Sequence, residues 1–149
     1  MGLSGCLAPA RNPGVRTRAA LYDAWAAWEG GRKAEALDAI RQALRFAPRE
    51  NVAPAVLVEV YDDAGLYFHV NGLHEESVAN QAVAVLLARK FGLPAAQQQL
   101  YEGRLRTALT AFDPALAQDA GTMETQRLLG LPGVRTNPHI RKYYRSWLA

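Results

Sequence analysis

Residues 33–46, KAEALDAIRQALRF, decide the fold of this 149-residue chain. Leu37, Ile40 and Leu44 recur every three to four residues, with charged side chains between them. This spacing is typical of an amphipathic helix with one buried face. Pro48 ends the helix, because proline cannot donate the amide hydrogen that an interior helical position requires.

A partner helix is predicted just before this stretch. Thr17 is a suitable N-cap, and the residues that follow, RAALYDAWAAWE, place Leu21, Trp25 and Trp28 on one face. Gly30-Gly31 then ends the helix. Two helices joined by so short a turn must lie antiparallel, as a hairpin.

The pattern recurs further along the chain. A longer helix is expected from a cap at Asn51 to about Val70, followed by a stop at Asn71-Gly72 and a return helix, HEESVANQAVAVLLARKF. A third pair is expected from residues 95–112 and a start at Asp113-Pro114, with further starts at Thr122 and Asn137-Pro138. No stretch alternates as a strand does, so the predicted fold is all-α, with residues 1–16 as a flexible N-terminal arm and 17–149 as a single helical-repeat domain.

The two hairpins share small residues at matching spacings: Ala24, Gly31, Ala36, Ile40 and Ala43 in the first, and Gly65, Gly72, Ser77, Gln81 and Ala84 in the second. Small residues at a helix crossing let the two axes approach closely. This arrangement resembles the tetratricopeptide repeat, and the resemblance implies a solenoid of antiparallel hairpins with a C-terminal capping helix. Gln81 departs from the pattern, because an apolar residue is expected there. The second repeat also begins later than the family period of about 34 residues, which predicts a lengthened helix over 52–71. The alternative is a generic helical bundle.

Tetratricopeptide arrays hold a peptide or a partner helix in a concave groove lined by the first helix of each hairpin. The resemblance therefore implies a partner-binding groove at the matching positions, which are Arg18, Leu21, Trp25, Trp28, Glu29, Glu59, Asp62, Leu66 and His69. Tryptophan and arginine are favoured anchors of protein interfaces. The alternative for Trp25 and Trp28 is that they pack in the core.

Other chemistry is poorly supported. His69 and His74 stand near several acids, but their spacing does not place two metal ligands on one helical face. No nucleophile elbow, zinc-protease motif or phosphate-binding loop is present, so we predict no catalysis, no cofactor and no metal. Arg141, Lys142 and Arg145 alternate with aromatic residues, which permits nucleic-acid binding. Ile140, Tyr144, Trp147 and Leu148 also form an apolar stripe along one terminal helix, and together with the net charge of only +3 this stripe favours a capping role for the tail.

The N-terminal stretch Leu3-Ser4-Gly5-Cys6 resembles the lipobox of bacterial lipoproteins and contains the only cysteine. The resemblance implies lipidation at Cys6 and a periplasmic protein anchored to the outer membrane. Residues 1–5 lack the charged start and apolar run of a secretory signal, so this reading requires an upstream start; otherwise Cys6 is a free thiol. The expected function is a non-catalytic scaffold that binds a protein or peptide, as an envelope lipoprotein assisting assembly of a secretion or pilus complex. The alternatives are a cytosolic adaptor or immunity-type protein, or a nucleic-acid-binding protein.

Overall fold

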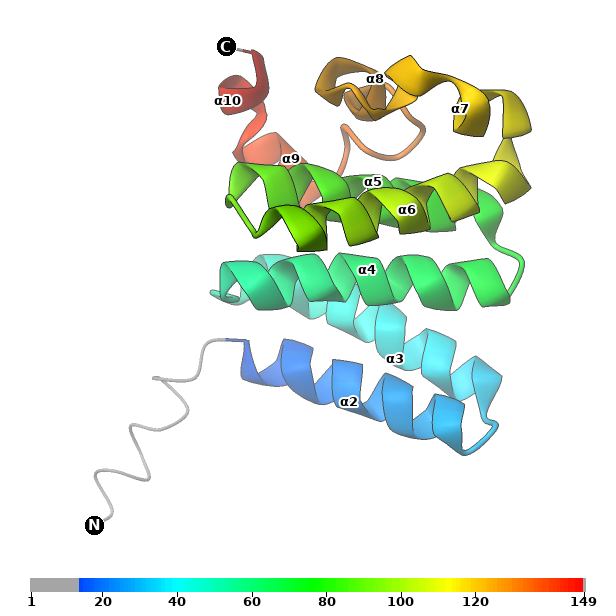
Figure 1. Cartoon of the computed structure of the whole chain (residues 1–149). Coiled ribbons are helices and arrows are strands. Elements are labelled where there is room, and N and C mark those ends of the chain that lie inside the picture. Colours follow the sequence, from blue (N-terminus) through cyan, green and yellow to red (C-terminus); the bar gives the residue numbers. More distant parts are fainter. Residues whose placement is uncertain (1–13, 149) are drawn as a thin grey trace.

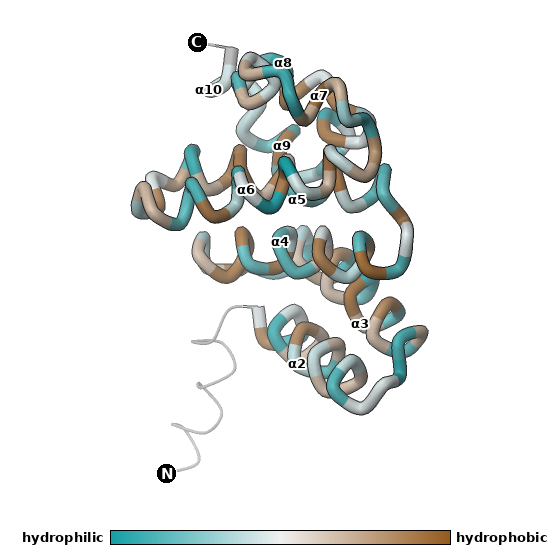
Figure 2. The backbone as a smooth tube through the Cα atoms, turned by 45° about the vertical axis from the view of Figure 1, so that its right-hand side comes forward, coloured by the Kyte–Doolittle hydropathy of each residue, from teal (hydrophilic) through white to brown (hydrophobic). Residues whose placement is uncertain are grey.

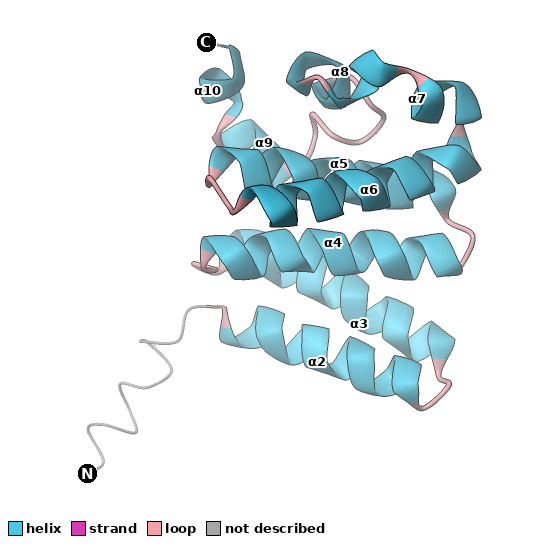
Figure 3. Cartoon of the chain, viewed as in Figure 1, coloured by secondary structure: helices cyan, strands magenta, loops and turns pink. Residues whose placement is uncertain are grey.

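The computed structural model describes residues 14–148, in which every regular element is helical (Figures 1 and 3). The all-α prediction is therefore confirmed for this part of the chain. The long helices are α2 (Val15–Glu29), α3 (Lys33–Phe46), α4 (Pro54–Val70), α5 (His74–Lys90) and α6 (Ala95–Phe112). The short ones are η1 (Ala47–Arg49), α7 (Pro114–Gln118), η2 (Ala120–Met123), α8 (Thr125–Leu129), α9 (Pro138–Lys142) and α10 (Tyr144–Leu148).

The long helices pack as neighbours along the chain. α2 packs on α3, α4 packs on α3 and α5, and α5 packs on α6. α4 also contacts both α2 and α6. As a result α2, α4 and α6 lie one above another on one side of the molecule, with α3 and α5 behind them (Figure 1).

The expected helix ends are largely those of the structure. Gly31, Gly72 and Gly92, which follow α2, α4 and α5, have positive φ, a conformation that residues with a Cβ resist. Asp113 and Asn137 accept hydrogen bonds from backbone amides at the starts of α7 and α9, as N-caps do.

Three predicted helix starts are wrong. Thr122 lies inside η2, and the next helix, α8, begins at Thr125. Thr17 lies inside the first turn of α2, which begins at Val15, and its hydroxyl donates to Glu50 Oε1 at 2.6 Å. This bond connects α2 to the turn before α4. α4 begins at Pro54 rather than at Asn51, because proline suits the first helical position, where no amide is needed. Residues 1–13 of the predicted N-terminal arm lie outside the described residues. The rest of it does not form an arm, because Gly14 is the N-cap of α2 and Val15 and Arg16 belong to that helix.

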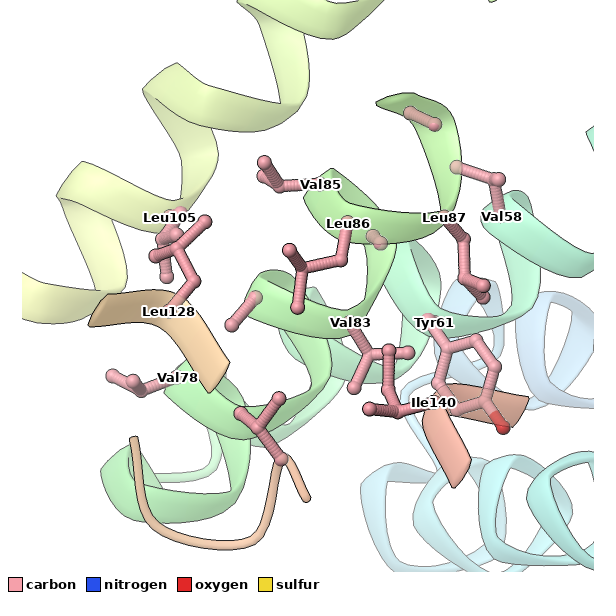
Figure 4. Close-up of a cluster of buried hydrophobic side chains, with 14 of the residues drawn as sticks. Val58, Tyr61, Val78, Val83, Val85, Leu86, Leu87, Leu105, Leu128 and Ile140 are labelled. Atoms are coloured by element: carbon pink, nitrogen blue, oxygen red, sulfur yellow. The ribbon is translucent and has the colours of Figure 1, made fainter. Parts of the chain in front are cut away.

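α5 is the centre of the core. Every residue from Gln81 to Ala88 is buried, so this helix has no solvent-exposed face over more than two turns. Figure 4 shows its valine and leucine side chains between Val58 and Tyr61 of α4, Leu105 of α6, Leu128 of α8 and Ile140 of α9. In Figure 2, by contrast, brown hydrophobic and teal hydrophilic stretches alternate along the outer helices.

The C-terminal helix differs from the prediction. A continuous helix with Ile140, Tyr144, Trp147 and Leu148 in one stripe was expected, but the helix breaks at Tyr143 into α9 and α10. Ile140 is fully buried, and the Tyr61 hydroxyl and His139 Nδ1 share a hydrogen bond of 2.8 Å. Tyr143, rather than Tyr144, packs edge-on against Phe91 at the end of α5. The break turns a different aromatic residue toward the core.

Gly65 of α4 leaves room for a side chain of α5. The Gln81 side chain is 1% exposed and lies where a Cβ on residue 65 would be, 2.4 Å from that position. Gln81 Nε2 donates to the Asp62 carbonyl at 3.0 Å, and Ser77 Oγ donates to the Gly65 carbonyl at 2.7 Å. The polar residue at position 81 thus bonds to the backbone of α4, where an apolar side chain was expected.

Gly65→Ala is expected to lower the free energy of unfolding by about 1–2 kcal/mol, because overpacking exceeds the gain in helix propensity. Gly103→Ala in α6 is the matched control: no neighbouring atom lies within 4 Å of its added Cβ, and the change should be neutral or stabilising. Urea denaturation measures both. Gln81→Ala should reduce the loss of stability caused by Gly65→Ala, because it removes the side chain that the new methyl group would meet. Equal changes of stability in Gly65→Ala and Gly103→Ala would show that the Gln81 side chain does not lie against Gly65.

Candidate functional site

A groove between α2 and α4 is the main hollow on the side formed by α2, α4 and α6. It consists of two adjoining pockets of about 330 and 270 Å³ that share Trp25 and Asp63. We call it the α2–α4 groove. Its first pocket is lined by Arg18, Leu21, Tyr22, Trp25, Val56, Glu59 and Asp63, and its second by Trp25, Trp28, Asp63, Leu66, Tyr67 and Val70.

A third hollow, of about 200 Å³, continues the same side between α4, α5 and α6. It shares Leu66 with the groove, and His69, Gln81 and Arg104 are among its other lining residues. The three hollows together follow the exposed face of α4 from Val56 to Val70.

The walls of the α2–α4 groove are apolar and open to solvent. Of the large hydrophobic side chains exposed within residues 14–148, Tyr22, Trp25, Leu66 and Val70 line this groove, whereas Val15 and Leu100 do not. Trp25 is 53% exposed. Trp28 is half-buried and meets the Tyr67 ring edge-on, with centroids 5.5 Å apart. Apolar exposure gathered in one hollow is typical of an interaction site.

The groove also contains a partly buried carboxylate. Asp63 makes no hydrogen bond or ion pair with residues 14–148. Burial, together with the negative charges of Glu59 and Asp62, raises its pKa to about 7. The groove therefore combines aromatic walls with an acid whose charge nothing in the described chain neutralises by direct contact.

The adjacent Asp62 has different surroundings. Its side chain is 5% exposed and forms an ion pair with Arg104 of α6, while its Oδ1 has no hydrogen-bond partner within residues 14–148. Burial raises its pKa, and the Arg104 charge opposes that rise. Asp62 therefore connects α4 to α6 beneath the surface.

The structure brings most of the sequence-predicted groove residues together. Arg18, Leu21, Trp25, Trp28, Glu59 and Leu66 line the α2–α4 groove, and His69 lines the adjoining hollow. Asp62 lies below the surface, and Glu29 is exposed but lines none of these hollows.

Sequence reasoning missed Tyr22, Val56, Asp63, Tyr67 and Val70. On α4 a signal was available, because Val56, Glu59, Asp63 and Val70 follow the three-to-four spacing of a single helical face. Asp62 is rotated away from that face by about 100°, the turn of one helical residue.

The remaining candidate sites lie elsewhere. The ring centroids of His69 and His74 lie 5.6 Å apart. Within residues 14–148, no three or more side chains of the metal-ligating types lie together as a cluster. Arg141 forms a shallow hollow with Arg135 and Tyr144, while the Lys142 amino group lies over the Tyr143 ring. Cys6 lies outside the described residues.

None of the described helices combines the length and the apolar character needed to cross a bilayer. Comparison of the chain with protein-family models, with curated proteins and with solved structures finds no match.

Proposed function

We propose that this protein is a non-catalytic helical scaffold that binds a segment of a partner protein in the α2–α4 groove. The observation that carries the proposal is the gathering of exposed hydrophobic side chains, Trp25 foremost, in one elongated hollow. A tryptophan that is half exposed in the free protein has much apolar area to bury on binding.

We further propose that the hairpins form a tetratricopeptide-like array. Support comes from the contacts of α4 with both α2 and α6, which put the first helices of successive hairpins on one side. A role as a lipidated envelope component that assists a secretion or pilus assembly rests on the lipobox-like stretch before Cys6. The intact mass of the mature protein from its host distinguishes a lipidated Cys6 from a free thiol.

Trp25→Ala is expected to weaken binding of groove ligands at least tenfold, because it removes an exposed tryptophan, the largest kind of aromatic anchor, from the point where the two pockets meet. The probes are 12-residue peptides selected on the wild-type protein from a random displayed library, and fluorescence anisotropy measures their affinities. Stability should change little, since half of the side chain already contacts water.

Leu100→Ala is the matched control, because Leu100 is also exposed (49%) but lines none of the hollows along α4. It should leave peptide affinity unchanged. If no peptide is selected, or if the selected peptides bind both variants like wild type, the groove is not the binding site.

A further inference from the structure

We propose that the segment bound in the α2–α4 groove carries a lysine or arginine next to an apolar residue, and that the Asp63 carboxylate binds this cation. The inference rests on the proposed function and specifies the chemistry of the partner. Asp63 has the position for this role, because it and Trp25 are the residues that line both pockets of the groove.

The charges around Asp63 call for a positive ligand. Glu59, Asp62 and Asp63 lie within two turns of α4, and Arg104 on α6 is the cation that acts on Asp62 and Asp63. Arg104 forms its ion pair with Asp62, not with Asp63. An arriving cation would find a carboxylate that has no hydrogen-bonding or ion-pairing partner within residues 14–148. The groove lining has two carboxylates, Glu59 and Asp63, and one cation, Arg18, so it carries a local excess of negative charge in a chain of net charge +3.

The aromatic walls suit the rest of such a side chain. Trp25, Trp28 and Tyr67 line the second pocket together with Asp63. The aliphatic stem of a lysine or arginine packs on apolar rings, and its charged end is attracted to their faces. Trp28 already binds one cation in this way, because the Lys33 amino group lies 5.7 Å from its ring centroid. No such cation lies over Trp25 within the described chain.

The carboxylates of Glu59 and Asp63 make acidic and wholly apolar ligands unfavourable. An acidic segment would place like charges beside Glu59 and Asp63, and a wholly apolar one would bury Asp63 without a partner. Leaving a charge buried and unpaired is costly. A cationic side chain satisfies the acid, and its apolar neighbour covers Leu66 and Val70.

The test uses the peptides selected on the full-length wild-type protein. Lysine or arginine should be enriched in them, and replacing that residue by its neutral analogue, norleucine or citrulline, should weaken binding at least tenfold. Asp63→Asn should weaken the parent peptide by a similar factor, and the analogue should then lose little more. Asp38→Asn is the matched control, because Asp38 is exposed on α3, away from the groove.

The outcomes separate the two proposals. If peptides depend on Trp25 but show no preference for a cation, and Asp63→Asn binds like wild type, the cation site is overturned and the groove stands. If no peptide depends on Trp25, both proposals fail. If Asp63→Asn and Asp38→Asn lose the same amount of affinity for the parent peptide, the effect comes from the overall charge of the protein, and this result would also overturn the cation site.

Discussion

Arg104→Met is expected to lower the free energy of unfolding by about 3 kcal/mol at pH 8. Asp62 is almost fully buried, and Arg104 is the cation that pairs with it. Removing one partner of a buried pair leaves an uncompensated charge, which costs about 3–5 kcal/mol. The lower end applies here, because about a third of the Arg104 side chain contacts water.

The loss should depend on pH. Burial already raises the pKa of Asp62, and removing Arg104 raises it further. Below that folded pKa the Asp62 carboxyl is protonated and uncharged, so the loss of its cation costs less. The difference in the free energy of unfolding between Arg104→Met and the wild type therefore becomes smaller as the pH falls. Urea denaturation at a series of pH values measures this dependence.

Two variants complete the test of the pair. Asp62→Asn combined with Arg104→Met should recover most of the lost stability, because no buried charge remains. Arg127→Met breaks an exposed pair with Asp119 and should have no measurable effect. Equal losses for Arg104→Met and Arg127→Met would show that the buried pair is not what stabilises the contact of α4 with α6.

Asp63→Asn is expected to stabilise the protein at pH 8, by roughly 2–4 kcal/mol. The folded pKa of Asp63 is about 7, against an ordinary value of 3.8. Between these values the folded state binds more protons than the unfolded state, so the stability of the wild type falls as the pH rises from about 4 to about 7. Asparagine cannot ionise, so the variant does not lose stability in this way as the pH rises.

The gain should therefore be largest above pH 7 and should disappear near pH 4. Thermal or urea unfolding of the two proteins across this range measures the difference. A pH-independent difference would show that ionisation of Asp63 is not its cause. If Asp63→Asn binds cationic peptides less well and is also more stable, its weaker binding is not caused by unfolding. A residue that contributes to binding at the expense of stability is expected at a binding site.

The sequence was sufficient for features with a local physical cause. The stripe of Leu37, Ile40 and Leu44 predicts α3, and glycine or a capping side chain fixes many helix ends, as Asn137 does for α9. Thr17 was misjudged because its hydroxyl bonds to Glu50, 33 residues away, rather than to its own helix. No local pattern contains that partner.

The groove was predictable in outline but not in detail. Trp25, Trp28 and Glu59 could be placed from helix spacing and the family resemblance. Helix spacing could put Asp63 on the groove face with Glu59, but the distinction between a carboxylate paired beneath the surface and one without such a partner is not a local property. That distinction depends on Arg104, 42 residues further on.

The burial of α5 has a consequence for the order of events during synthesis. When residues 74–90 leave the ribosome, only α4 is available to cover them, and α6 must follow. Leu128 and Ile140 close the remaining sides, so the leucines and valines of α5 stay in contact with water until those last segments have been made. At about 5–20 residues per second this interval lasts several seconds, in which the nascent chain exposes to chaperones or to other nascent chains a helix that has no solvent-exposed face from Gln81 to Ala88 in the folded protein.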